Sequence, residues 1–327
     1  TDYVEPEYTS IHKDYKINLA WHAVAGTGGN DTFDSLVANT KGLTTISPTW
    51  FYLKDNEGNI ESFASETYVN KAHERGLEVW GLVENMTGTD VSTFEVLSAT
   101  TRRTNLIRNL MDQALTYHLD GINVDFESLS TDTGEHFVQF LRELSIACRR
   151  EGIVLSVDNY VPIGNTNHYN RKEQGVVADY VIIMGYDEHY RGSEEAGSVA
   201  SIGFVENGIK KTLEEVPAEK VINAIPFYTR IWDTTGGTVE SQAVGMDLAE
   251  EYIKNHNITT VWDEEACQNY GTYESGGTKH EVWLEDAESI RVKLNVMEAN
   301  GIAGVACWKL GYEKPEIWDV IAEYLEK

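Results

Sequence analysis

Long apolar runs are absent from this sequence. No stretch approaches the roughly 18 apolar residues that a membrane-spanning helix needs, and the first residues lack the basic and apolar regions of a signal peptide. We therefore expect a soluble chain with no membrane partner. The sequence begins at Thr1, in an acidic and tyrosine-rich stretch, which predicts a processed or trimmed product of a longer precursor.

Basic residues are scarce. The 26 lysines and arginines face 53 aspartates and glutamates, so the formal net charge is -27. A field of this sign repels phosphate backbones and anionic lipid headgroups, which argues against nucleic acid and membrane surfaces as partners. The acidic excess indicates either a well-solvated surface or a preference for a neutral or cationic substrate.

Disulfide and metal-binding patterns are also missing. The three cysteines, Cys148, Cys267 and Cys307, are odd in number and form no C-x-x-C pair, so we expect neither a disulfide framework nor a zinc site. Cys148 falls in an amphipathic helical pattern and Cys307 in an apolar strand, which predicts buried thiols. No H-E-x-x-H motif and no phosphate-binding loop occurs. The sequence therefore predicts no cofactor and no bound metal.

The chain does contain a regular alternation of strand-like and helix-like segments. Short β-branched or aromatic runs recur eight times with helical patterns between them, which is typical of a parallel sheet with crossover helices. Eight such units predict a (β/α)8 TIM barrel, an α/β fold that carries its chemistry at the C-terminal ends of the strands. The predicted strands cover residues 15–21, 43–52, 77–84, 119–126, 153–159, 180–186, 221–228 and 302–310.

Two helices are especially clear. Pro315 is expected to open the last helix of the chain. A second helix follows the fourth strand and ends at Gly152, with one apolar stripe made of Phe137, Phe140, Leu141, Leu144 and Cys148.

One interval breaks the rhythm of strands and helices. About 55 residues separate the seventh strand from a helix near Asp286, and they hold a helix of their own, GMDLAEEYIKNHN, with short strands. We expect a small α+β insertion at about residues 233–285, between strand 7 and helix 7, that stands beside the mouth of the barrel. The predicted domains are an N-terminal tail over residues 1–14 and one catalytic barrel over residues 15–327.

The segment LDGINVDFES, residues 119–128, combines a buried strand pattern with three acids at the expected end of the fourth strand. Because successive side chains of a strand point to opposite faces, alternation sorts the segment into two sets. One set points toward the helix layer and consists of Ile122, Val124 and Phe126. The other set points into the barrel and consists of Gly121, Asn123, Asp125 and Glu127.

Carboxyl groups inside a barrel are costly to desolvate unless they are hydrogen-bonded or used. A rise of about 3.3 Å per residue places Asp125 one side-chain layer below Glu127, near enough to share a proton, so the pKa of one carboxyl should rise. Glu127 is then a candidate acid near neutral pH, with Asp125 as its partner. Two alternatives stay open: a polar network that only fixes the strand register, and a divalent-metal site with Asp120, Asp125 and Glu127 as oxygen ligands.

The octet DGINVDFE at residues 120–127 resembles D-G-x-x-x-D-x-E, the signature of family 18 glycoside hydrolases, whose terminal glutamate is the catalytic acid. Three further motifs follow in the order of that family. MGYD at residues 184–187 resembles its M-x-Y-D, and PFYTR at residues 226–230 resembles its P-x-Y-x-R. Trp308 ends the eighth strand, where the family keeps a tryptophan under the sugar. The resemblance covers residues 17–325.

The sequence departs from the family pattern at two places. Asn123 replaces an aspartate that often lies between the outer acids, which shortens the acid relay toward the core, although a neutral hydrogen-bonding partner for Asp125 could still serve. The third strand, VWGLVEN at residues 79–85, lacks the Gly-Gly pattern of chitinases, which weakens chitin as the substrate. The motifs WG at 80–81, MGYDEH at 184–189 and WKLG at 308–311 resemble the bacterial branch of spore-cortex and cell-wall N-acetylglucosaminidases.

The resemblance implies a retaining hydrolase of β-1,4-linked N-acetylglucosamine polymers, in which the 2-acetamido oxygen of the substrate is the nucleophile. Glu127 would protonate the glycosidic oxygen and then activate the water that opens an oxazolinium intermediate. Asp125 would hold the proton of Glu127 and then bond the acetamido N–H. Tyr186 would donate to the acetamido oxygen, and Asp187 would help to bind the distorted sugar.

The resemblance also implies a set of substrate-binding residues. Trp308 would form the apolar floor under the ring, and the remaining members are Tyr228, Arg230, Met184, Asn123 and Trp21. Three further tryptophans, Trp50, Trp232 and Trp283, either stack on additional sugars or pack in the core and rim.

The main alternative is a non-catalytic chitin- or peptidoglycan-binding lectin on the same barrel. Such relatives usually lose the terminal glutamate, whereas this chain keeps Glu127 together with Asp125, Tyr186 and Asp187. We expect a monomer whose partner is a polysaccharide containing N-acetylglucosamine. The family resemblance implies a protein outside the cell, in a bacterial cell wall or spore, and the choice between chitin and peptidoglycan stays open.

Overall fold

The computed structural model describes residues 9–327, so residues 1–8 of the predicted tail lie outside the described part of the chain. Eight parallel strands form a closed barrel, because β2 pairs with β1 on one side and with β5 on the other. The (β/α)8 barrel predicted from the sequence is therefore confirmed. Its strands are β1 (Ile17–His22), β2 (Thr45–Pro48), β5 (Glu78–Glu84), β6 (Gly121–Asp125), β7 (Val154–Tyr160), β8 (Tyr180–Met184), β9 (Val221–Pro226) and β15 (Gly304–Trp308).

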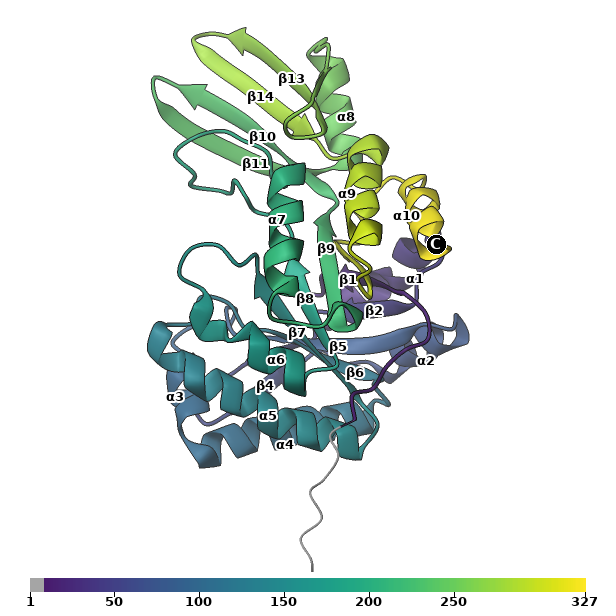
Figure 1. Ribbon diagram of the computed structural model, residues 1–327, viewed down its shortest axis with the longest axis vertical. Helices are drawn as coiled ribbons and strands as arrows, with labels where there is room; N and C mark the ends of the chain where they lie inside the picture. Colours follow the sequence, from purple (N-terminus) through teal and green to yellow (C-terminus); the bar gives the residue numbers. More distant parts are fainter. Residues whose placement is uncertain (1–8) are drawn as a thin grey trace, which may run out of the picture.

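The helices surround these strands (Figure 1). The apolar stripe predicted for the helix after the fourth strand lies on α5 and is buried throughout, as is the thiol of Cys148. The last helix begins at Ile317, two residues after Pro315. The helices of the barrel are α1 (Phe33–Val37), α2 (Glu66–Glu74), α3 (Thr93–Ser98), α4 (Thr100–Thr116), α5 (Gly134–Arg150), α6 (Arg171–Val177), α7 (Ile202–Leu213), α9 (Ala287–Ala299) and α10 (Ile317–Leu325). No helix in residues 9–327 is both long and apolar enough to pass through a membrane.

Two apolar clusters account for the strand patterns. The larger cluster fills the space between the barrel and the helices. In it, Phe126, which directly follows β6, stacks on Phe140 of α5 with ring centroids 5.6 Å apart. The smaller cluster fills the barrel itself. Strands buried on both faces read as nearly continuous apolar runs, which is why the eight runs stood out in the sequence. The members of the inner cluster include Ile17, Leu19, Trp21, Trp80, Leu82, Tyr180, Ile182 and Ala224.

Residues between β9 and α9 form a second, antiparallel sheet of five strands, which projects from one end of the barrel together with α8 (Figure 1). It starts at Tyr228, earlier than the boundary near residue 233 that the sequence indicates, because β10 follows β9 almost without a break. Its elements are β10 (Tyr228–Thr235), β11 (Thr238–Gly245), α8 (Met246–Asn255), β12 (Val261–Asp263), β13 (Gln268–Ser275) and β14 (Thr278–Leu284). A short hairpin of β3 (Phe51–Leu53) and β4 (Ile60–Ser62) extends the barrel sheet beside β5.

A buried ion pair joins the second sheet to the barrel helices. Asp286 caps α9 through the N–H of Ser289, and the preceding residue, Glu285, accepts from the Nζ of Lys293 at 2.9 Å. Both side chains of this pair are only 1% exposed. Glu285 also accepts from Ser289 and from Gln268 of β13, so its carboxylate fixes the start of α9 against the sheet.

Candidate active site

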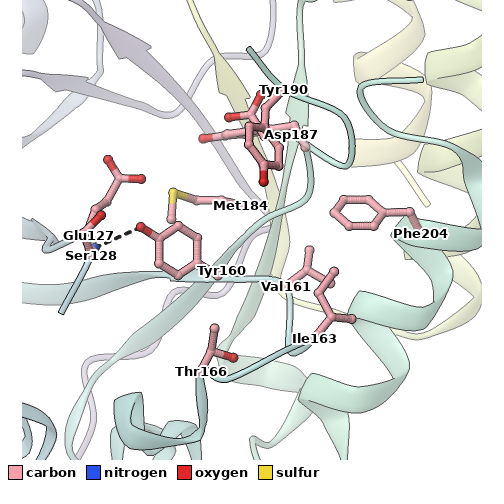
Figure 2. Close-up of a pocket in the computed structure, with 11 residues that line it drawn as sticks. Glu127, Ser128, Tyr160, Val161, Ile163, Thr166, Met184, Asp187, Tyr190 and Phe204 are labelled. Atoms are coloured by element: carbon pink, nitrogen blue, oxygen red, sulfur yellow. Dashed lines mark hydrogen bonds between the residues drawn. The ribbon is translucent and has the colours of Figure 1, made fainter. Parts of the chain in front are cut away.

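A cleft opens at the C-terminal ends of the barrel strands. Its inner part is a cavity of about 210 Å³ and its outer part a cavity of about 600 Å³. The two cavities share four lining residues, Glu127, Met184, Tyr186 and Asp187, so they lie side by side. Figure 2 shows the outer cavity, with Glu127 on one side and Phe204 of α7 on the other.

The main chain of Glu127 is held by a neighbouring strand. Asn85, which follows β5, accepts from the Glu127 N–H at 2.8 Å and donates to the Glu127 carbonyl at 2.9 Å. The next N–H, that of Ser128, donates to the hydroxyl of Tyr160 at 3.0 Å (Figure 2). Because Ser128 has a φ of 53°, the chain turns sharply just after Glu127. The side chain of Glu127 points into the cleft.

The environment of Glu127 favours its protonated form. Burial raises the pKa of this carboxyl, and the nearby charges of Asp187 and Glu84 raise it further, while a hydrogen bond from Tyr160 lowers it. A raised pKa lets a carboxyl keep its proton to higher pH, which suits a general acid. The pKa rise predicted for one of the two carboxyls is present in both, and its main cause is burial rather than repulsion between the two.

Asp125 lies deeper, and its carboxyl is even less able to ionise. Its Oδ1 atom is buried and has no hydrogen-bond partner among the described residues. Burial raises the pKa of Asp125 well above its usual value, and the charges of Asp158, Glu127 and Glu84 raise it further. A proton shared within this group relieves the repulsion between like charges.

Asn123 lies below Asp125 and is completely buried. Its Oδ1 accepts from the Nε1 of Trp21 at 3.1 Å, and its Nδ2 donates to Ser156 and to Asp158, each at 2.8 Å. Ser156 and Asp158 lie on the neighbouring strand β7, and Trp21 lies on β1, which does not pair with β6, so contacts from two strands fix the amide in one orientation. Asn123 thus connects Ser156 in the barrel interior with Asp158, which lines the inner cavity.

Close packing explains two glycines of the site motifs. A Cβ on Gly121 would lie 2.5 Å from the indole of Trp80, and a Cβ on Gly185 would lie 2.6 Å from the carbonyl oxygen of Ala224. Side chains at these positions would displace the strands that carry Asp125 and Tyr186.

Aromatic side chains surround the inner cavity. Trp21 and Trp308 lie with ring centroids 6.0 Å apart, and Tyr186 lies edge-on to Tyr228 at 6.1 Å. The Tyr228 hydroxyl donates to Asp187 in a short hydrogen bond. Asp187 itself has a φ of 58°, a left-handed conformation that aspartate and asparagine adopt more readily than most residues. The cavity thus combines an apolar aromatic surface with several carboxyl groups.

The structure brings most of the predicted site residues together, but Arg230 and Asn123 do not line the cleft. Arg230 is absent from the lining of both cavities, because it lies on β10, where it donates to Ser241 at 3.0 Å. Asn123 lies beneath the cavity floor. The predicted residues that line the inner cavity are Trp21, Asp125, Glu127, Met184, Tyr186, Asp187, Tyr228 and Trp308.

The three additional tryptophans do not reach this cleft. Trp50 and Trp232 are fully buried, which leaves no face for a sugar, so both pack in the interior of the protein. Trp283 lies on β14 of the second sheet, where its Nε1 donates to Asp263 at 3.3 Å.

The sequence interpretation missed three polar residues of the site, Asp158, Asn85 and Tyr160. Asp158 and Tyr160 share the inward face of β7 with Ser156, so the alternation rule that identified Asp125 would also have identified them. Asn85 follows the end of a strand in a loop. No local pattern marks it, because its role depends on a contact with a residue 42 positions away.

The three acids of the metal-dependent alternative are not brought together. Asp120 precedes β6 at the opposite end from Glu127, and its Oδ2 bonds His73 and the N–H of Val79. Within residues 9–327, no group of three or more histidine, cysteine or acidic side chains has an arrangement that could hold a metal ion.

Comparison with known proteins gives one family for nearly the whole chain. Residues 17–313 match the model of the glycosyl hydrolases family 18. The cortical fragment-lytic enzyme of Bacillus subtilis (strain 168) is 29% identical over 251 residues, which cover 74% of this chain and 58% of that protein. This chain therefore spans just over half the length of that relative.

Solved structures share the fold. The spore cortex-lytic enzyme SleL of Bacillus cereus superposes with a TM-score of 0.85 at 24% identity, over 95% of this chain and 74% of that one. A chitinase from Chromobacterium violaceum ATCC 12472 gives a TM-score of 0.84 at 22% identity, over 95% of this chain and 99% of that one. Both likenesses concern the arrangement of strands and helices.

Proposed function

The chain belongs to the glycosyl hydrolases family 18, and on this premise we propose that it hydrolyses β-1,4-linked polysaccharides containing N-acetylglucosamine, with retention of configuration. The observation that carries the proposal is the inner cavity. There the carboxyls of Glu127 and Asp125, whose pKa values are raised mainly by burial, meet an aromatic surface that includes Trp308. An apolar floor with converging acids suits a neutral sugar ring whose leaving group must be protonated.

The proposed reaction has two steps. In the first, Glu127 gives its proton to the glycosidic oxygen, the bond from that oxygen to C1 breaks, and the acetamido oxygen of the same sugar bonds to C1. In the second, the Glu127 carboxylate takes a proton from water while the water oxygen bonds to C1 and the acetamido oxygen leaves. Two displacements at one carbon retain its configuration, and no enzyme carboxylate bonds to the sugar.

The other residues of the cavity have supporting roles in this proposal. Asp125 accepts from the acetamido N–H and so stabilises the positive charge that develops on the ring formed in the first step. Tyr186 donates to the acetamido oxygen. Asp187, held by Tyr228, binds the distorted sugar. Trp308 supports the apolar face of the ring, and Trp21, which is only 1% exposed, packs behind Trp308. Because these groups are already in place before the reaction, they lower its activation barrier without any rearrangement of the protein.

Bacterial cell-wall material, in particular spore-cortex fragments, is the proposed natural substrate, with chitin oligomers as the second candidate. The relatedness to a cortical fragment-lytic enzyme supports the first choice, and so does the strand β5 sequence without the Gly-Gly pattern of chitinases. The same relationship supports a location at the cell wall or spore of a bacterium.

Product analysis tests the proposal. Purified cortex, vegetative peptidoglycan and chitin oligomers are digested in parallel, the fragments are identified by mass, and the anomeric configuration of new ends is followed by proton NMR. We expect initial β-anomers from at least one substrate, and no cleavage of a matched β-glucoside that has a hydroxyl in place of the acetamido group. Sugar binding without turnover would instead support the lectin alternative, and α-anomeric initial products would contradict the retaining mechanism.

A further inference from the structure

Asp158 is an acid inside the barrel to which the proposed reaction assigns no role. It lies on β7 and is only 2% exposed. Strands β6 and β7 pair in register from Gly121 opposite Val154 to Val124 opposite Val157. The next residues in this register are Asp125 and Asp158. Neighbouring strands lie about 4.8 Å apart, and both side chains line the inner cavity, so the two carboxyl groups are neighbours.

The contacts of Asp158 fix its position. Its Oδ1 accepts from Asn123 Nδ2 at 2.8 Å, and Asn123 is held in turn by Trp21 and Ser156. Because the Nδ2 group of Asn123 is engaged with Asp158 and Ser156, and its Oδ1 with Trp21, the amide has no free donor for Asp125. The Oδ1 of Asp125 is left without a partner among the described residues.

Few other charges face this pair. The titratable groups that face the pair are Glu127 from the β6 side, Glu84 at the end of β5, Tyr160 at the end of β7 and Tyr186, which follows β8. Neither cavity lining contains a lysine, arginine or histidine in the part of the chain that the structure describes. Two adjacent carboxyls without a cation can coexist in a buried site only if they share a proton.

We propose that Asp158 supplies, from the neighbouring strand, the acid that the sequence lacks at position 123, and that it acts as a positioning residue for Asp125. This inference rests on the proposed function. In the resting protein one proton is shared between the two carboxyls. When substrate enters, the proton stays on Asp158 and Asp125 turns away as a carboxylate, free to accept from the acetamido N–H. No proton is gained or lost in this step.

An exchange of the two side chains tests the proposal. Asp158→Asn removes the acid from β7. The double variant Asn123→Asp with Asp158→Asn moves the acid from β7 to β6, so the protein keeps the same number of acids and of amides. The control is Ser156→Ala, which removes one bond of Asn123 but no acid. The kcat and KM of each protein are measured on the substrate with the highest turnover, together with thermal unfolding.

We expect Asp158→Asn to lower kcat by about 100-fold with little change in KM, since a misplaced catalytic group costs about that much. The double variant should recover at least about tenfold of this loss, and Ser156→Ala should stay within about threefold of the parent. A folded double variant as slow as Asp158→Asn would overturn the proposal, as would full activity of Asp158→Asn. Should Asp158→Asn fail to fold, the double variant decides by itself, because the kcat of a folded form should stay within about tenfold of the parent value and a larger loss would overturn the proposal.

A titration without substrate separates this inference from the proposed function. The side-chain carbons of Asp125 and Asp158 are followed by NMR against pH in the parent and in Asp158→Asn. Removal of the neighbouring charge should lower the titration midpoint of Asp125. An unchanged midpoint would refute the proton sharing even in an active enzyme, whereas a parent that turns over no substrate would refute only the proposed function.

Discussion

The side chain of Asn85 brackets the main chain of Glu127, with Oδ1 accepting from its N–H at 2.8 Å and Nδ2 donating to its carbonyl at 2.9 Å. A glutamate that follows its strand in a sharp turn would otherwise have a mobile backbone. The bracket ties it to β5, a rigid strand of the barrel, and a third contact from Asn85 to Thr93 ties the bracket to α3. The position of the candidate acid is therefore set by a residue that does not line either cavity.

Asn85→Ala should lower kcat by about 10- to 100-fold and leave KM nearly unchanged, because the acid is displaced while the sugar-binding surface stays intact. The matched control is Asn109→Ala on α4, which removes a single bond to the carbonyl of Gly58, remote from the site. Steady-state kinetics on one oligosaccharide check both variants. A parental kcat in a folded Asn85→Ala protein would show that the bracket is not needed.

The charge of Asp187 should set the upper pH limit of activity. Burial is the main cause of the raised pKa of Glu127, and Asp187 is the first charge that adds to it. In Asp187→Asn this repulsion is lost, so the pKa of Glu127 falls and the acid loses its proton at a lower pH. The alkaline limb of the kcat profile should then move to lower pH. Asparagine tolerates the positive φ of this position, so the fold should persist.

The pH profile of kcat, measured for the parent and for Asp187→Asn, checks this expectation. Asp34→Asn serves as the control, since Asp34 pairs with Lys71 on the surface, where both side chains are well exposed. An alkaline limb that stays in place, or moves to higher pH, would mean that Asp187 does not act on Glu127 through its charge.

The buried pair of Glu285 and Lys293 should matter more for stability than any surface pair. Lys293→Met leaves an uncompensated carboxyl in a fully buried site, which typically costs about 3–5 kcal/mol. Lys210→Met breaks an exposed pair with Glu206, for which about 0.5 kcal/mol is expected. Urea denaturation measures both. Equal losses in the two variants would contradict the role of the buried pair, and Glu285→Gln combined with Lys293→Met should restore part of the loss.

The barrel could be predicted because its evidence is local. Each strand is a short apolar run, as in residues 180–184, and the inward acids of residues 120–127 follow from alternation within one strand. Both signals are visible without knowledge of the neighbours. The same applies to α5, whose stripe is a property of one helix.

The remaining features depend on contacts between segments. No local pattern around Asn85 marks it as part of the site. The motif PFYTR predicts Arg230 in the site together with Tyr228, but β10 directs the Arg230 side chain toward Ser241. Alternation along β7 predicts that Asp158 points into the barrel, but its position beside Asp125 depends on the register of β6 with β7. Contacts of this kind are fixed by tertiary packing and do not appear in a single sequence.

The most direct test of the account is the hydrolysis rate of Glu127→Gln. Glutamine keeps the size of the side chain and the bracket on its main chain but has no proton to give to a glycosidic oxygen. We expect kcat to fall by about 10²- to 10⁴-fold, the usual range for a general acid, while the dissociation constant for the oligosaccharide stays within a few-fold of the parent. A Glu127→Gln protein that degrades its polysaccharide as fast as the parent would contradict the central claim that Glu127 is the catalytic acid.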